Sequence, residues 1–144
     1  MRNALPSPAL VSCCVLLALL VGCSGYRTQP VKGKVTIKNA ASPAKLAGYG
    51  VMLEMMEPGP DGKVISSSGV IDAEGKFQLG THGSNDGAYP GKYRVAITPS
   101  SEFAEGPKPK SAIDPKYHSL QTSGLEAVID AKTSELNWEL DPGR

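Results

Sequence analysis

Cysteines are the residues of this sequence best suited to covalent chemistry, and Cys23 differs from the other two in its surroundings. Cys13 and Cys14 lie inside an uncharged apolar run from Ala9 to Val21, whereas Cys23 follows that run among glycine and serine residues. A thiolate is a strong nucleophile at accessible pH, and small neighbours let an enzyme approach the backbone closely. The position of Cys23 therefore indicates a site of covalent modification.

The apolar run has the layout of an export signal. It follows a short basic start with Arg2 and ends in a cluster of small residues, and it is shorter than the roughly 20 apolar residues that span a bilayer. A buried core helix is the alternative, but the run is apolar on every face and the rest of the chain offers no helical partner for it. Loss of the signal would leave Cys23 as the one cysteine, which excludes an internal disulfide.

The stretch Leu20-Val21-Gly22-Cys23 resembles the bacterial lipobox. The resemblance implies that a diacylglyceryl group is attached to the sulfur of Cys23 and that the chain is cleaved between Gly22 and Cys23. Two or three acyl chains on one residue give durable membrane attachment, whereas a single chain binds only marginally. We therefore expect a signal peptide over residues 1–22, a lipidated tether over 23–29 and a domain over 30–144, held at a membrane on the periplasmic or outer-surface side of the cell envelope.

The charge balance of the mature chain argues against nucleic acid as a partner. Removal of Arg2 with the signal leaves 14 basic residues against 14 acidic ones. Nucleic-acid binding needs a basic field, which a neutral chain of this kind does not provide.

Alternating apolar residues predict short β-strands in the domain. In the segment 30–37, Val31, Gly33, Val35 and Ile37 fall on one face, while lysines that would protect an edge strand fall on the other. The same period and frequent glycine or proline turns predict seven strands, over residues 30–37, 48–57, 63–72, 75–79, 91–97, 125–129 and 136–140. The expected fold is all-β, a seven-stranded antiparallel β-sandwich.

The largest side chains on the predicted inner faces are Phe77, Tyr93 and Trp138. Trp138 has two interpretations, as a core residue or as a platform on which a carbohydrate could stack. Its alternation with Leu136 and Leu140 favours the core.

Several stretches together resemble the carboxypeptidase regulatory-like, transthyretin-like β-sandwich domain. They are Val31-Lys-Gly-Lys-Val35, Gly69-Val-Ile-Asp-Ala-Glu-Gly-Lys-Phe77 and Gly87-Ala-Tyr-Pro-Gly-Lys-Tyr93. Pro115-Lys-Tyr117 with Thr122-Ser-Gly-Leu125 is similar, more narrowly, to small lipoproteins of planctomycete bacteria. The resemblance implies a transthyretin-like or immunoglobulin-like sandwich preceded by a signal-peptide helix, and it implies no activity.

Physical reasons accompany these motifs. Asp72 can bond the backbone of the following turn, which Gly75 can close with a positive φ. The Tyr93 hydroxyl can reach a nearby backbone group, as in a tyrosine corner.

Candidate catalytic and metal-binding residues are few. His82 with Asp86 is a conceivable metal pair, and His118 lies far away in the sequence. The stretches 85–87 and 61–62 match only fragments of a calcium loop. The C-terminus also lacks the Tyr-Arg-Gly-Ser ending of transthyretin-like hydroxyisourate hydrolases. We therefore predict a protein that is not an enzyme, with no cofactor, no catalytic residue and no metal ligand, and the ligand-binding residues stay unknown.

A long segment without periodicity, Pro99 to Leu120, contains prolines at 99, 107, 109 and 115. Segments of this length in compact domains are often functional or disordered, and the alternative to a functional loop is a flexible excursion with a few anchoring contacts. If consecutive strands run in opposite directions, the connection after the fifth strand lies at the end away from the tether, so we expect this segment to be membrane-distal.

Two functions fit these observations. One is a non-catalytic module that binds or scaffolds another envelope component, protein or glycan. The other is an accessory protein that captures a small ligand, a carbohydrate or a metal. An apolar pocket with convergent polar groups would favour capture, and a flat surface would favour scaffolding.

Overall fold

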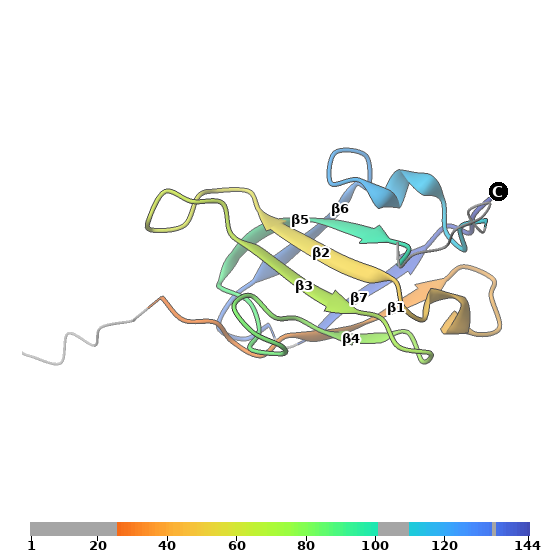
Figure 1. Ribbon diagram of the computed structural model, residues 1–144, viewed down its shortest axis with the longest axis horizontal. Helices are drawn as coiled ribbons and strands as arrows, with labels where there is room; N and C mark the ends of the chain where they lie inside the picture. Colours follow the sequence, from red (N-terminus) through yellow and green to blue (C-terminus); the bar gives the residue numbers. More distant parts are fainter. Residues whose placement is uncertain (1–25, 101–109, 134) are drawn as a thin grey trace, which may run out of the picture.

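The computed structural model describes residues 26–100, 110–133 and 135–144, and it is built of β-strands in two sheets (Figure 1). The expected signal helix, together with Gly22 and Cys23, lies outside these residues. The seven strands are β1 (Lys32–Ile37), β2 (Gly50–Met55), β3 (Ser66–Val70), β4 (Lys76–Gln78), β5 (Gly91–Thr98), β6 (Leu125–Ile129) and β7 (Glu135–Leu140). Two short 3₁₀-helices, η1 (Pro43–Leu46) and η2 (Pro115–His118), lie in connections. In the part of the chain that is described, no helix is long and apolar enough to cross a bilayer.

The strands form one sheet of three, in the order β4-β1-β7, and one of four, in the order β3-β2-β5-β6. Each predicted strand is present. The prediction of a wholly antiparallel fold is wrong in one pair, because β1 and β7 run parallel over six residue pairs, from Lys32 opposite Glu135 to Ile37 opposite Leu140. Consecutive strands alternate in direction, so the first and the seventh point the same way, and their pairing has to be parallel.

The position of β1 corrects a second expectation. β1 is the central strand of its sheet, paired with both β4 and β7. Its outward lysines therefore do not protect an edge, and they project from the middle of the sheet surface instead.

One hydrophobic core joins the inner faces of the two sheets, and both sheets contribute to it as the alternation predicts. Val35, Leu53, Tyr93 and Val95 are fully buried. The predicted third strand contributes less than its apolar content implies, because Val64 and Val70 stay on the surface.

Phe77, Gly33 and Trp138 form a close contact across the three-stranded sheet. Phe77 lies directly opposite Gly33 on the neighbouring strand, and its ring stacks on that of Trp138 with centroids 5.6 Å apart and planes 5° apart. A Cβ atom at residue 33 would lie 2.4 Å from the Phe77 ring and 2.2 Å from the Leu136 carbonyl oxygen. Trp138 is half-buried and packs against the core, so the core interpretation is the one that its contacts match.

Both predicted turn devices are confirmed. The Asp72 carboxylate accepts hydrogen bonds from the backbone amides of Glu74 (2.8 Å) and Lys76 (2.9 Å), and Gly75 has φ +81°. The Tyr93 hydroxyl donates to the Tyr89 carbonyl oxygen at 2.8 Å, which forms the tyrosine corner. Burial raises the pKa of Tyr93 to about 12.

Substitution of Gly33 tests the close contact. Gly33→Ala places a methyl group against the Phe77 ring and a backbone carbonyl, and overpacking of this kind costs about 1–3 kcal/mol. We expect the free energy of unfolding in urea to fall by that amount. Gly83→Ala is the matched control, since an added Cβ there meets nothing within 4 Å; equal stability of the two variants would contradict the packing argument.

Candidate functional site

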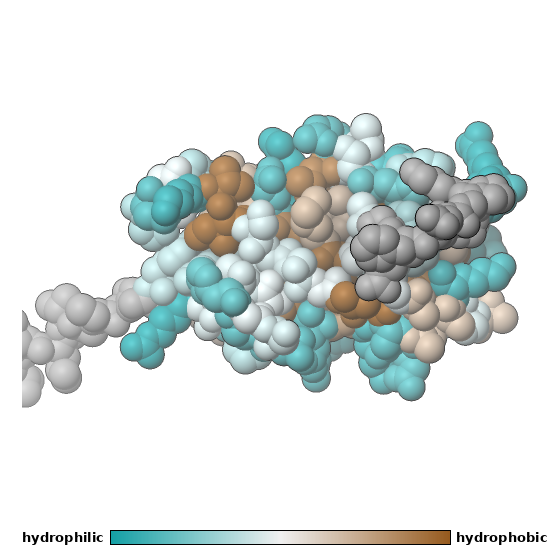
Figure 2. All heavy atoms as spheres, viewed as in Figure 1, coloured by the Kyte–Doolittle hydropathy of each residue, from teal (hydrophilic) through white to brown (hydrophobic). Residues whose placement is uncertain are grey.

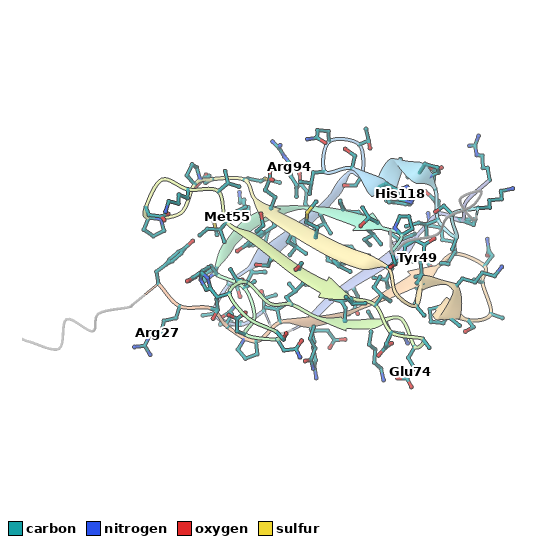
Figure 3. All side chains as sticks on the ribbon, in the orientation of Figure 1. Arg27, Tyr49, Met55, Glu74, Arg94 and His118 are labelled. Atoms are coloured by element: carbon teal, nitrogen blue, oxygen red, sulfur yellow. The ribbon has the colours of Figure 1, made fainter. Side chains whose placement is uncertain are left out.

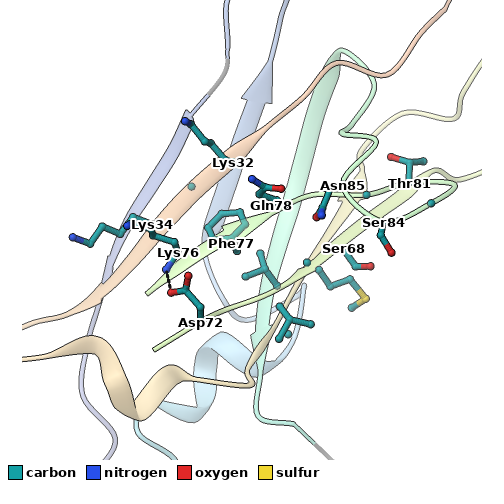
Figure 4. A pocket seen from close by; sticks show the side chains of 18 of the residues that line it. Lys32, Lys34, Ser68, Asp72, Lys76, Phe77, Gln78, Thr81, Ser84 and Asn85 are labelled. Atoms are coloured by element: carbon teal, nitrogen blue, oxygen red, sulfur yellow. Dashed lines mark hydrogen bonds between the residues drawn. The ribbon is translucent and has the colours of Figure 1, made fainter. Parts of the chain in front are cut away.

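An open groove of about 1350 Å³ runs along the side of the molecule where β3 and β4 meet (Figure 4). β3 and β4 belong to different sheets. An isolated bridge between Ser68 of β3 and Gly80, which follows β4, connects the two sheets on this side. Gly69 permits the close approach, because a Cβ there would lie 2.2 Å from the Gln78 carbonyl oxygen. The groove is thus a consequence of how the two sheets come together.

Lysines form one wall of the groove. On the outer face of the three-stranded sheet, Lys32 lies between Gln78 and Glu135 on the flanking strands, and Lys34 lies opposite Lys76. Like charges directly opposite each other on a sheet are unfavourable. Such an arrangement is suited to an anionic ligand that would offset the repulsion.

The three lysines differ in their partners. Lys76 forms an ion pair with Glu74 at 2.7 Å, and its hydrogen bond to that carboxylate raises the pKa of Lys76. Neither Lys32 nor Lys34 has a carboxylate within 4.0 Å among the residues that the structure describes. Both are exposed, so they are the cations of this wall that are available to a ligand.

The opposite wall is a loop over residues 80–87 that the Asp86 carboxylate holds in shape. Asp86 accepts hydrogen bonds from the backbone amides of Thr81 (2.6 Å), His82 (3.1 Å) and Gly83 (3.1 Å). These bonds, the one from Thr81 first, lower the pKa of Asp86. The hydroxyl of Thr81 in turn lies 2.7 Å from that of Ser67. The wall is therefore preformed, and it presents the side chains of Ser84 and Asn85 to the groove.

The conceivable metal pair does not form through its side chains. The His82 ring lies 2.8 Å from the Tyr89 hydroxyl and meets the Tyr89 ring edge-on, while the Asp86 carboxylate is occupied by backbone amides. His118 lies near the opposite end of the strands, labelled in Figure 3. Within the described ranges, no group of three or more His, Cys, Asp or Glu residues has metal-binding geometry.

One contact that the sequence reasoning missed pairs a serine with a histidine. Ser111 Oγ lies 3.1 Å from His118 Nε2. The same oxygen donates to the Ile113 carbonyl oxygen at 2.8 Å and accepts from the Ile113 amide at 3.3 Å. A nucleophile needs a base that a third group orients, and no third group bonds His118 in the described part of the chain. The contact closes a local turn.

The described part of the predicted long segment lies at the far end of the strands. Of its described residues, 99–100 directly follow β5, and residues 112–117 contact the C-terminus beyond β7. Ile113 bridges to Pro142, and the Tyr117 hydroxyl donates to the Asp141 carboxylate at 2.9 Å. Residue 32 lies at the other end of the strands, so these residues lie away from the tether, as expected. Their distance from a membrane stays a prediction, and 101–109 lie outside the described residues.

Asp141 is the centre of that contact. Its carboxylate binds the ammonium groups of Lys116 and Lys38, the latter at 2.7 Å. Hydrogen bonds from Lys116, Lys38 and Tyr117 hold the pKa of Asp141 well below its usual range. Sequence reasoning missed this cluster because Asp141 belongs to an Asp-Pro-Gly ending with no pattern of its own.

Comparisons with known proteins add no relative: no family model matches the chain, and neither the curated proteins nor the solved structures contain a match.

The Asp141 cluster predicts a pH dependence of stability. A carboxylate whose pKa is lowered in the folded state stabilises the protein above its unfolded pKa of about 4, and that contribution is lost as the pH falls. We expect Asp141→Asn to lower the urea midpoint at neutral pH and to reduce the loss of stability on acidification. Glu126→Gln, at an exposed site on β6, should leave the profile unchanged. A profile of Asp141→Asn that parallels the wild type would disprove the role of the cluster.

Proposed function

We propose that this protein is a lipid-anchored module of the bacterial cell envelope that binds another envelope component, protein or glycan, without catalysis. The observation that supports binding is the open groove, with the exposed cations Lys32 and Lys34 on one wall and hydroxyl and amide groups on the other. Ligands of this groove would have anionic character and an extended shape, because the groove is open along its length.

Anchoring rests on the sequence. The apolar run, the small residues and Cys23 together support export, lipidation at Cys23 and cleavage after Gly22. Held in this way, the module would stay at one membrane surface and meet its partner there.

The transthyretin-like class is the finer fold that we propose. The tyrosine corner at Tyr93 and the turn at Asp72 support a β-sandwich of this general kind. An immunoglobulin arrangement would place the first strand beside the second in one sheet. Here β1 pairs with β4 and β7, and β2 pairs with β3 and β5, so the immunoglobulin-like alternative loses support.

Capture of a small ligand, a carbohydrate or a metal is less well supported. Small-molecule sites are concave and bury most of their ligand, whereas the groove beside β3 and β4 is open to solvent. An extended partner suits the groove better than a small one does.

Substitution of Cys23 tests the anchor. Cys23→Ala removes the sulfur that accepts the lipid. We therefore expect the protein to move from the detergent phase to the aqueous phase in a detergent-partition assay, and its mass to lack that of the lipid. Cys13→Ala with Cys14→Ala is the matched control, since both residues would leave with the signal. Unchanged partition of Cys23→Ala would rule out this anchor.

Charge reversal in the groove tests the binding site. Affinity capture from native membranes, followed by mass spectrometry and glycan analysis, should identify a partner of the wild-type protein. We expect Lys32→Glu with Lys34→Glu to lose it, and the wild-type interaction to weaken as salt screens the charges. Lys45→Glu with Lys110→Glu, exposed and outside the groove, should retain the partner. Equal capture by both double variants would exclude the groove.

A further inference from the structure

The described residues that follow the expected lipid attachment, 26–29, are not a free linker. Residues 26–29 belong to the predicted tether, yet they contact the domain. The Tyr26 ring stacks on Tyr89 with centroids 4.3 Å apart and planes 12° apart. Gln29 and Ala88 exchange two backbone hydrogen bonds, of 2.9 and 3.0 Å. Contacts with the domain therefore begin at Tyr26 among the described residues.

This docking sets a short distance between the lipid and the domain. Three residue steps separate Cys23 from Tyr26, and an extended chain spans at most about 3.5 Å per residue, or roughly 10 Å in all. Whatever path the chain takes, a lipid on Cys23 keeps Tyr26 within that reach. Tyr26 must then lie at the level of the headgroups or just above them.

The surface around Tyr26 has the composition of a membrane interface. We call it the tether end and define it by residues 26–31 and the connections 56–65, 79–90 and 130–133. Tyr26 is 41% exposed and Val64 61% exposed, and Figure 2 shows hydrophobic atoms near the connection between β2 and β3. Prolines surround a shallow cleft of about 380 Å³ beside Tyr26. Tyrosine is favoured at headgroup depth because its ring is apolar and its hydroxyl is polar.

The charges of the tether end indicate which membrane surface it suits. Exposed cations and anions balance there: Arg27, Lys63 and Lys132 against Glu57, Asp61 and Asp130. A surface made for anionic lipids would carry a basic excess. The tether end lacks one in its described residues, so its complement is a zwitterionic headgroup layer.

We propose that the tether end rests on a zwitterionic phospholipid surface, with Tyr26 and Val64 at headgroup depth, so that the strands stand away from the bilayer. The inference rests on the proposed lipidation of Cys23. The anchor raises the effective concentration of the surface at the bilayer, so a small apolar contact is sufficient to orient the domain.

Two valines provide a matched test. Val64 and Val70 are 61% and 67% exposed, and they lie before and at the end of β3, roughly 20 Å apart at 3.3 Å per residue. A lipidated Cys23 has no free thiol, so Val64→Cys and Val70→Cys each give one labelling site for an environment-sensitive fluorophore. The full lipidated chain is placed in phosphatidylcholine vesicles, with and without phosphatidylcholine that bears a spin label near the headgroup.

We expect the fluorescence emission of the label at residue 64 to shift to shorter wavelength. The spin label should quench it several-fold more strongly than the label at residue 70. Replacement of part of the phosphatidylcholine by anionic lipid should leave that difference unchanged. Equal quenching at the two sites, or a difference that needs anionic lipid, overturns the inference. Labelling of the wild-type protein at Cys23, or failure of the wild type to float with the vesicles, overturns the proposed anchor instead.

Discussion

The parallel pairing of β1 with β7 is the constraint on which the rest of the structure depends. It joins the two ends of the domain through six residue pairs and makes β1 the central strand of its sheet. The register places Leu136 beside Gly33, where the sheet is packed too closely for a side chain at 33. At the other end, the Lys38 amide donates to the Leu140 carbonyl oxygen, which brings Asp141 beside Lys38. Contacts between residues so distant in sequence carry an entropic cost, because a long loop has to be closed.

Local patterns predicted the strands because each strand has one wet face and one buried face. The alternation of Val31, Val35 and Ile37 reports burial directly, and the structure buries all three. Alternation does not report which strand lies beside which, so the parallel pair and the central place of β1 were missed. The sequence favours edge protection by the outward lysines for the same reason. A side-chain period of two shows which residues share a face, but it does not show which strands pair.

The candidate site was less predictable than the fold. Lys32 and Lys34 have no distinguishing pattern in the sequence. They become candidates because an open groove runs beside both and because Lys76 lies opposite Lys34. The sequence makes Asp86 a candidate metal ligand, but its carboxylate oxygens accept hydrogen bonds from three backbone amides. A carboxylate near a histidine has the same sequence signature in both roles. Only the direction of its hydrogen bonds separates them.

The geometry of the two sheets relates the anchor to the groove. All seven strands run between the tether end, where β1 begins, and the end where Asp141 binds Lys38 and Lys116, as Figure 1 shows. The groove follows β3 and β4, so its long direction is also that of the strands. A domain that rests on its tether end would hold this groove upright above the membrane, with Lys32 near the bilayer and Lys34 and Lys76 farther out. A polymer that extends outward from the membrane would meet the lysine wall along its length, whereas a ligand confined to the bilayer would reach only the lowest part. The proposed anchoring and orientation would therefore select among partners by their position and shape, in addition to any recognition by side chains.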